Sequence, residues 1–159
     1  MPNNFQSGAT IDTRPKEKKL KDFFFNEVVA SANPVNWVEK PQDKWRRFPD
    51  QNQDGSGSCV MQTTRKLAGI QMFLKEGKFV EMSAGFYQLR SNKPASGMLG
   101  VEAFDIWMNK GLPLEALIES DRMSDAEMDA IVIEQYEKDI AKIFAIGGHV
   151  GIANGDFET

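Results

Sequence analysis

Cys59 is the only cysteine of the chain, and it follows a glycine-serine turn at the predicted start of a helix. The N-terminus of a helix carries about half a positive charge, which favours a thiolate over a thiol. Backbone N–H groups at such a start can also stabilise an oxyanion. The position therefore suits a nucleophilic thiol, and the alternative is a small buried apolar residue, as most free cysteines are.

Gln53 lies six residues before Cys59 and could complete an acyl-transfer site. When a thiolate attacks a carbonyl, the oxyanion that develops needs two hydrogen-bond donors. The Cys59 backbone N–H and the Gln53 side-chain amide could supply them, because a glycine-rich turn would let the amide fold back toward the helix start. These two residues are the candidate catalytic pair.

A calcium loop is the competing interpretation of the same stretch. Asp50, Asn52, Asp54 and Gly55 reproduce the first half of an EF-hand loop. The twelfth position should supply a bidentate glutamate but is Met61, and no helical pattern precedes the loop. With one cysteine and one histidine, the chain also lacks the usual ligands of a zinc site. We expect neither a metal nor a cofactor.

Apolar periodicity and capping signals predict helices that would position these residues. They cover, approximately, residues 58–77, 83–89, 101–111 and 124–147. The first is apolar on most sides, which predicts a central, buried helix. The last begins at a capping box formed by Ser124 and Glu127 and is predicted to be one long amphipathic helix that ends at Gly147. Residues 149–153 are predicted to begin a strand.

Length and composition limit the classes of function. The chain has 159 residues, of which 41% are hydrophobic, so we expect one domain or part of one. The net charge of −4 argues against nucleic-acid binding. No apolar run is long enough to span a membrane, so we expect no membrane association. A single cysteine favours a reducing compartment such as the cytoplasm.

The stretch from Asn52 to Cys59 resembles the nucleophile motif of papain-like cysteine peptidases, with the same Gln-to-Cys spacing and the same Gly-Ser before the thiol. The resemblance covers roughly residues 33–159. Four other segments carry it: 33–37, similar to the start of the mature domain; 82–84; 96–100, similar to the glycine strip of the substrate cleft; and 146–157, similar to the strand that crosses into the second half.

The resemblance implies an α+β, papain-like fold, with a mainly helical subdomain and the first strands of an incomplete β subdomain. Residues 1–32 would form an N-terminal extended arm, and residues 33–159 a peptidase domain incomplete at its C-terminus. Cys59 would be the nucleophile and Gln53 would belong to the oxyanion hole. Ser96, Gly97 and Met98 would bind a peptide or protein substrate, which would be cleaved through a thioester.

The sequence departs from the family pattern in two places. Ser56 replaces a cysteine that forms a disulfide in secreted members, which agrees with an intracellular, disulfide-free type. The family's histidine and asparagine are expected about 130–150 residues after the nucleophile, beyond Thr159. His149 comes 90 residues after Cys59 (149 − 59), and it could act as the base only if a turn at Asn154 brought that residue back as its partner.

Two functions therefore remain open. In one, a further segment or chain completes the fold and supplies the base, so that the protein is a cysteine peptidase. In the other, the chain is a catalytically inactive papain-like scaffold with a structural or assembly role in a larger complex. The protein could come from a bacterium or a phage, and a phage protein could be associated with the virion.

Overall fold

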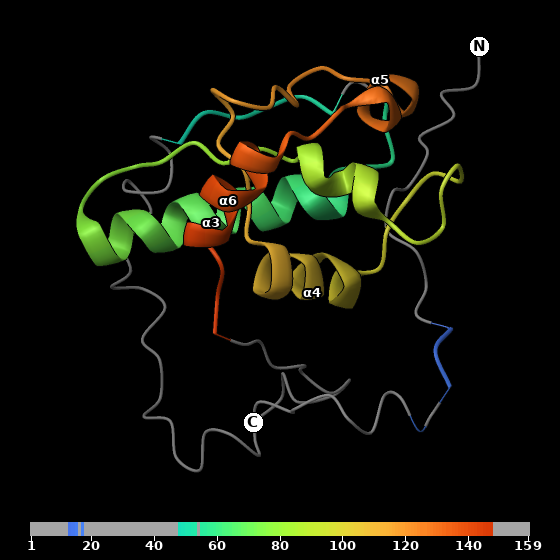
Figure 1. The fold of residues 1–159 in the computed structure, drawn as a ribbon, viewed down its shortest axis with the longest axis horizontal. Coiled ribbons are helices and arrows are strands. Elements are labelled where there is room, and N and C mark those ends of the chain that lie inside the picture. The colour runs from blue at the N-terminus through green and yellow to red at the C-terminus, as the bar shows by residue number, and fades with distance from the viewer. Residues whose placement is uncertain (1–12, 16, 18–47, 54, 148–159) are drawn as a thin grey trace, which may run out of the picture.

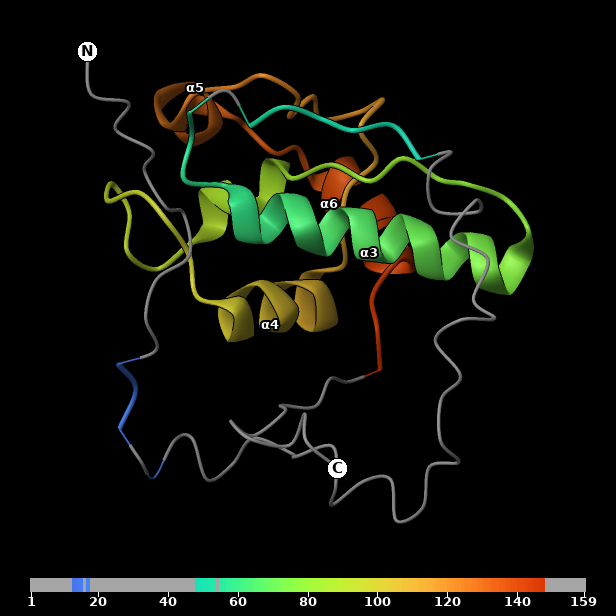
Figure 2. The same cartoon turned by 180° about the vertical axis from the view of Figure 1, so that it is seen from behind.

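The computed structural model describes residues 13–15, 17, 48–53 and 55–147. The described part beyond Phe48 is built from helices: α3 (Cys59–Glu76), the 3₁₀-helix η3 (Gly85–Leu89), α4 (Gly100–Lys110), α5 (Asp125–Ala130) and α6 (Gln135–Ile143). Two opposite views show α4 running beside α3, and α5 at the end of the fold where α3 begins (Figures 1 and 2). Helix α4 also contacts α6 and η3, and α5 contacts η3.

Helix α3 has the predicted boundaries. It begins at Cys59 and is followed by Gly77, which adopts the left-handed conformation (φ +69°) and donates its N–H to the Phe73 carbonyl at 2.8 Å. The helix is buried over its first part, where Met61 and Ala68 enter the core, whereas Leu74 is 59% exposed. The prediction of a central, buried helix thus holds for the segment that begins with the cysteine.

Among the described residues, each of α3, η3, α4, α5 and α6 contributes apolar side chains to the core. Its largest fully buried members are Phe86, Tyr87, Met61, Met82, Met98, Leu112 and Met128. Helix α4 has the predicted extent and ends before Gly111. Gly111 has a φ of +79°, and a Cβ there would lie 1.8 Å from the Ala141 carbonyl oxygen of α6, so only glycine fits between these helices.

The prediction of one long helix over residues 124–147 is wrong. The structure has α5 and α6 instead, separated by an extended segment at 131–134, and α6 ends at Ile143. Three consecutive β-branched residues, 131–133, occupy the break, and such residues lose side-chain freedom in a helix. Glu134 and Glu137 form a second capping box, which starts α6 afresh. Ile133 can then point into the core while Val132 faces solvent.

The β part of the predicted fold is not seen in the described region. Met82 and Leu114 form an isolated antiparallel bridge, and none of the described residues belongs to a β-strand. The predicted strand that begins at His149, the arm over 1–32 and the segment 33–37 all lie outside the described residues, apart from a few positions of the arm. No helix among the described residues has both the length and the apolar character needed to cross a bilayer.

Candidate active site

The chain turns sharply just before α3. Ser56 donates its backbone N–H to the Gln53 carbonyl at 2.9 Å, and the Gln53 side-chain amide donates to the Ser56 carbonyl at 3.1 Å. Gly55 lies inside this turn with a φ of +81°, a conformation that glycine adopts without strain. These two bonds fold the Gln53 side chain back onto Ser56, three residues before α3 begins.

Cys59 is the first residue of α3 and is partly exposed. The first N–H groups of a helix have no acceptor within that helix, and they carry the positive end of its dipole. The Ser58 carbonyl accepts the first intrahelical bond, from Gln62 N–H at 2.9 Å. The Cys59 backbone N–H therefore lies at the positive end of the helix dipole, where an oxyanion could be stabilised.

Gly57 brings the segment predicted to bind substrate next to this turn. A Cβ at Gly57 would lie 2.1 Å from the Ser96 hydroxyl oxygen, 2.4 Å from the Gly97 nitrogen and 2.8 Å from the Tyr87 hydroxyl oxygen. The absence of a side chain is what allows this approach. The structure thus places Ser96 and Gly97 against the residues that precede Cys59.

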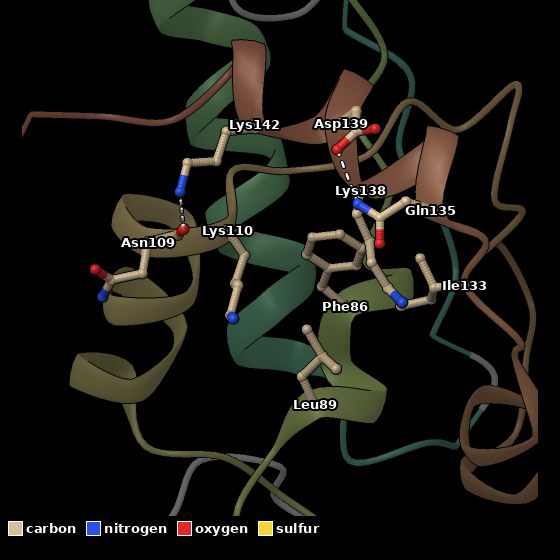
Figure 3. Close-up of a pocket in the computed structure, with 9 residues that line it drawn as sticks. All are labelled: Phe86, Leu89, Asn109, Lys110, Ile133, Gln135, Lys138, Asp139 and Lys142. Carbon is tan, nitrogen blue, oxygen red and sulfur yellow. Dashed lines mark hydrogen bonds between the residues drawn. The ribbon is translucent and has the colours of Figure 1, made fainter.

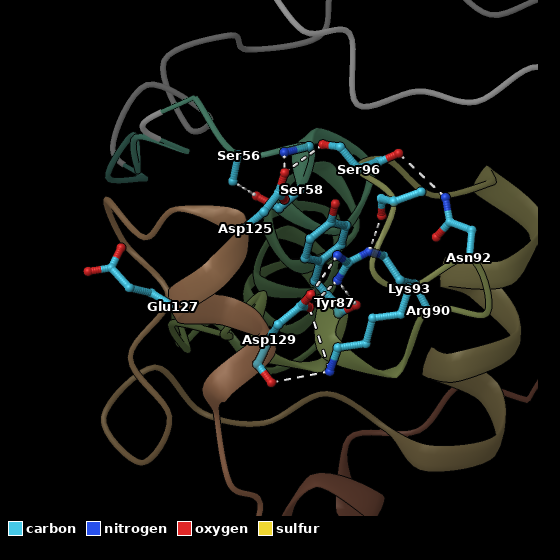
Figure 4. A network of polar contacts seen from close by, with 12 residues as sticks. Ser56, Ser58, Tyr87, Arg90, Asn92, Lys93, Ser96, Asp125, Glu127 and Asp129 are labelled. Atoms are coloured by element: carbon cyan, nitrogen blue, oxygen red, sulfur yellow. Dashed lines mark hydrogen bonds and ion pairs between the residues drawn. The ribbon is translucent and has the colours of Figure 1, made fainter.

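Asp125, the first residue of α5, lies between these two segments. Its Oδ1 accepts the Gly57 backbone N–H at 3.0 Å, and its Oδ2 accepts the Ser96 hydroxyl at 2.6 Å. The Tyr87 hydroxyl also hydrogen bonds to it. Figure 4 shows the carboxylate between the turn and the strip. One side chain thus joins the turn before Cys59 to the segment predicted to bind substrate.

Tyr87 supports the same junction from the core. It is fully buried, and its hydroxyl accepts the Gly97 backbone N–H at 2.8 Å while it hydrogen bonds to Asp125. The N–H of Gly97 is therefore used inside the protein. Met98 is 1% exposed and belongs to the core, so its side chain anchors the strip from beneath.

The charge on Asp125 is stabilised by these contacts. Partial burial raises the pKa of its carboxyl, but hydrogen bonds from Ser96, Gly57 and Tyr87, together with the charge of Arg90, hold that pKa below its ordinary value. The pKa of Tyr87 is raised, chiefly by burial and also by the neighbouring carboxylate. The pair therefore consists of a neutral phenol that donates to an ionised carboxylate at neutral pH.

One turn further along α5, Asp129 forms a second attachment. Arg90 Nη1 and Nη2 donate to its two oxygens at 2.6 and 3.1 Å, and the Arg90 side chain is fully buried. The guanidinium also donates to the Ala95 carbonyl at 2.9 Å and lies 4.0 Å above the Tyr87 ring. Lys93 approaches Asp129 at 3.6 Å. Helix α5 is thereby fixed to the loop that carries Ser96 (Figure 4).

The sequence did not reveal Asp125, Arg90 or Asp129 as parts of the site. Asp125 was visible only as an acidic residue in a capping box, and Arg90 as a charge at the end of a short helix. The spacing of Asp125 and Asp129, four residues apart, places both on one helix face. That spacing indicated that both carboxylates could contact the same neighbouring segment, but it did not identify Arg90 or Gly57 as the partners.

Two residues of the calcium interpretation contact other parts of the fold. Asp50 forms an ion pair with Lys66 of α3. The Asn52 backbone N–H donates to Asp121 at 2.7 Å, and its carbonyl accepts from Arg122 N–H at 2.7 Å. These contacts tie the loop to the body of the fold. Asp54 lies outside the described residues, as does His149, the alternative base.

A cavity of about 370 Å³ opens elsewhere, between η3, α4 and α6 (Figure 3). Its lining consists of Phe86, Leu89, Asn109, Lys110, Ile133, Gln135, Lys138, Asp139 and Lys142. None of these is a predicted site residue. Lysines lie around an apolar floor, and Lys142 donates to the Asn109 carbonyl at 2.7 Å. The turn before Cys59 is therefore not part of this cavity.

No protein-family model matches the sequence, and no curated protein matches it. Among solved structures, the chain is similar to the crystal structure of xylellain, a cysteine protease from Xylella fastidiosa, with a TM-score of 0.68 at 16% identity. The fold is papain-like. The match covers 92% of this chain and 58% of xylellain, so the chain spans somewhat more than half the length of that protein.

The papain-like fold confirms the helical part of the prediction. Met61 and Ala68 of α3 are buried in the core, and the first residue of this helix is Cys59. The roles of Cys59, Gln53, Ser96, Gly97 and Met98 remain predictions, because at this identity the likeness concerns the fold. The geometry adds that a turn, a strip and a bridging carboxylate meet at the start of α3.

Proposed function

We propose that this chain carries the nucleophile and the oxyanion donors of a cysteine peptidase. The observation that supports the proposal is the position of Cys59, which begins the central helix of a papain-like fold while Gly57 packs against Ser96 and Gly97. A thiolate at this point would face a peptide held along the strip. We also propose that the complete fold is α+β and that a further segment or chain completes it.

In the proposed reaction, the Cys59 thiolate forms a bond to the carbonyl carbon of a peptide, and the carbonyl oxygen becomes an oxyanion. The Cys59 N–H and the Gln53 amide donate to it. An amide has two N–H donors, so Gln53 can keep its bond to Ser56 while it donates the second hydrogen. The C–N bond then breaks, the amine leaves with a proton from the base, and water hydrolyses the thioester.

The base would be a histidine supplied by the segment or chain that completes the fold, and His149 is the alternative within this sequence. The peptide would lie beside the strip in an extended form. Because the Gly97 N–H already donates to Tyr87, main-chain bonds from the peptide would go to carbonyl groups of the strip. The cytoplasm or another reducing compartment, where Cys59 stays a thiol, would suit this chemistry.

The test is covalent labelling of Cys59. The protein is treated with a peptidyl fluoromethyl ketone and with iodoacetamide from pH 5 to 8, and the modified residue is located by mass spectrometry. We expect Cys59 to react with the peptidyl reagent faster than free cysteine does, and Cys59→Ala to abolish the label. A rate no greater than that of free cysteine would reject Cys59 as an activated nucleophile in this chain and favour the inactive scaffold. A lower rate in His149→Ala would identify His149 as the base.

A further inference from the structure

We propose that Asp125 is a positioning residue that keeps the turn before Cys59 and the Ser96–Gly97 strip at a fixed separation. Its two carboxylate oxygens are divided between these segments, since Oδ1 accepts from Gly57 N–H and Oδ2 from the Ser96 hydroxyl. Movement of either segment would break a hydrogen bond to a charged group, and such bonds are among the stronger ones in proteins.

Capping of α5 does not explain this placement. Ser124 and Glu127 already form a complete capping box, in which the Glu127 carboxylate accepts from Ser124 N–H at 2.8 Å. Asp125 instead directs both oxygens away from its own helix, toward residues 29 and 68 positions earlier in the chain. The carboxylate therefore makes tertiary contacts with two segments of the candidate site.

The supports around Asp125 give it a fixed position. The Arg90–Asp129 ion pair holds α5 one turn further along, with a fully buried arginine side chain. Tyr87 contacts Asp125 and Gly97 at once, so the strip, the carboxylate and the core share one hydrogen-bond network. Asp125 is thus held from its own helix and from the core while it joins the two segments.

The consequence for catalysis rests on the proposed peptidase function. A peptide between the strip and Cys59 reacts only when its carbonyl lies at the sulfur, and a misplacement of about 1 Å can cost about 100-fold in rate. Asp125→Ala should therefore slow the reaction with a peptidyl fluoromethyl ketone by at least about tenfold. Iodoacetamide needs no binding site and should react within about threefold of the wild-type rate.

Amide hydrogen exchange measured by NMR tests the structural part on its own. In Asp125→Ala we expect Gly57 N–H to exchange at least about tenfold faster than in the wild type, relative to amides in the middle of α3. Asp125→Asn, which keeps one carbonyl acceptor, should show a smaller increase. Asp129→Asn is the comparison variant: it loosens the anchoring of α5 but keeps the acceptor of Gly57, so its increase at Gly57 should be smaller than that of Asp125→Ala.

The outcomes separate the two proposals. Unchanged exchange at Gly57 in folded Asp125→Ala would overturn the positioning role. If Asp125→Ala does not fold, two other variants decide. Unchanged exchange at Gly57 in Asp125→Asn, together with an unchanged ratio of peptidyl to iodoacetamide labelling in Ser96→Ala, would then overturn the role. If wild-type Cys59 shows no preference for the peptidyl reagent, the peptidase function fails, and exchange at Gly57 still decides whether Asp125 joins the two segments. An equal fall of that ratio in Asp129→Asn would assign the effect to general loosening and reject the positioning role.

Discussion

Gly57 and Ser96 are packed so closely that a methyl group on Gly57 would lie 2.1 Å from the Ser96 hydroxyl oxygen and 2.4 Å from the Gly97 nitrogen. The serine side chain could rotate away, but the backbone nitrogen cannot yield without moving the strip. Gly57→Ala should therefore separate the strip from the turn and lower the rate of Cys59 labelling by a peptidyl reagent by at least about tenfold.

Gly55 offers a matched control for this substitution. A Cβ at Gly55 would meet nothing within 4 Å, although its φ of +81° is unfavourable for most residues. Asparagine tolerates this backbone conformation, so Gly55→Asn should change both labelling and stability little. If Gly57→Ala and Gly55→Asn label at the same rate, the close contact with Ser96 has no bearing on the site.

A comparison of substitutions at Gln53 and at Gln51 tests whether Gln53, and not any nearby glutamine, is the oxyanion donor. Gln53 donates its amide within the turn, whereas Gln51 donates to Glu81 at 2.9 Å. Removal of one oxyanion-hole donor costs about 10²–10³ in kcat. We therefore expect Gln53→Ala to slow labelling by a peptidyl fluoromethyl ketone about 100-fold, and Gln51→Ala to remain within about threefold. Similar rates for both variants would remove Gln53 from the oxyanion hole.

Local signals predicted the parts of the fold that depend on neighbouring residues. Gly77 and Gly111 ended helices as expected, and the glycine-serine turn folded back before Cys59 as its composition indicated. Ser56, where secreted members of the resembled family have a disulfide cysteine, hydrogen bonds to Ser58 at 2.7 Å between side-chain oxygens. These features need only short-range information, so the sequence was sufficient.

The features that the sequence did not predict depend on contacts between distant segments. The three β-branched residues at 131–133 fit an amphipathic helix by spacing, yet in the fold Ile133 reaches the core from an extended segment. Likewise, the partners of Asp125 lie 29 and 68 residues earlier in the chain. No periodicity or capping rule contains that pairing, because it exists only once α5 has packed on η3.

Substitution of Asp129 and substitution of Arg90 should lower the stability of the protein by different amounts. Asp129→Asn leaves a fully buried guanidinium without its counter-charge, and such a loss costs about 3–5 kcal/mol. Arg90→Met removes the buried charge, and Asp129, whose side chain is 20% exposed, keeps Lys93 nearby. We expect chemical denaturation to give a larger loss of stability for Asp129→Asn. The reverse order would show that the arginine is well satisfied by the Ala95 carbonyl and the Tyr87 ring.

Asp125 should add an acid-sensitive term to stability. Because its pKa is lowered in the folded protein, its contribution is fully present above its ordinary pKa of 3.8 and is lost as the pH falls through the folded value. The wild type should therefore melt at a higher temperature than Asp125→Asn at pH 6, and the gap should narrow below pH 4. Asp50 and Glu127, whose pKa values are also lowered, are common to both proteins and cancel in the comparison.

The break between α5 and α6 is tested by truncating its side chains one at a time. Ile133 is 8% exposed and Val132 is 76% exposed. Removal of a buried isoleucine side chain costs about 2–5 kcal/mol, whereas an exposed truncation stays within about 0.5 kcal/mol. Urea denaturation should thus show a large loss for Ile133→Ala and almost none for Val132→Ala. In a continuous helix, alanine at position 132 would raise helix propensity, so a marked gain in stability there would contradict the extended segment.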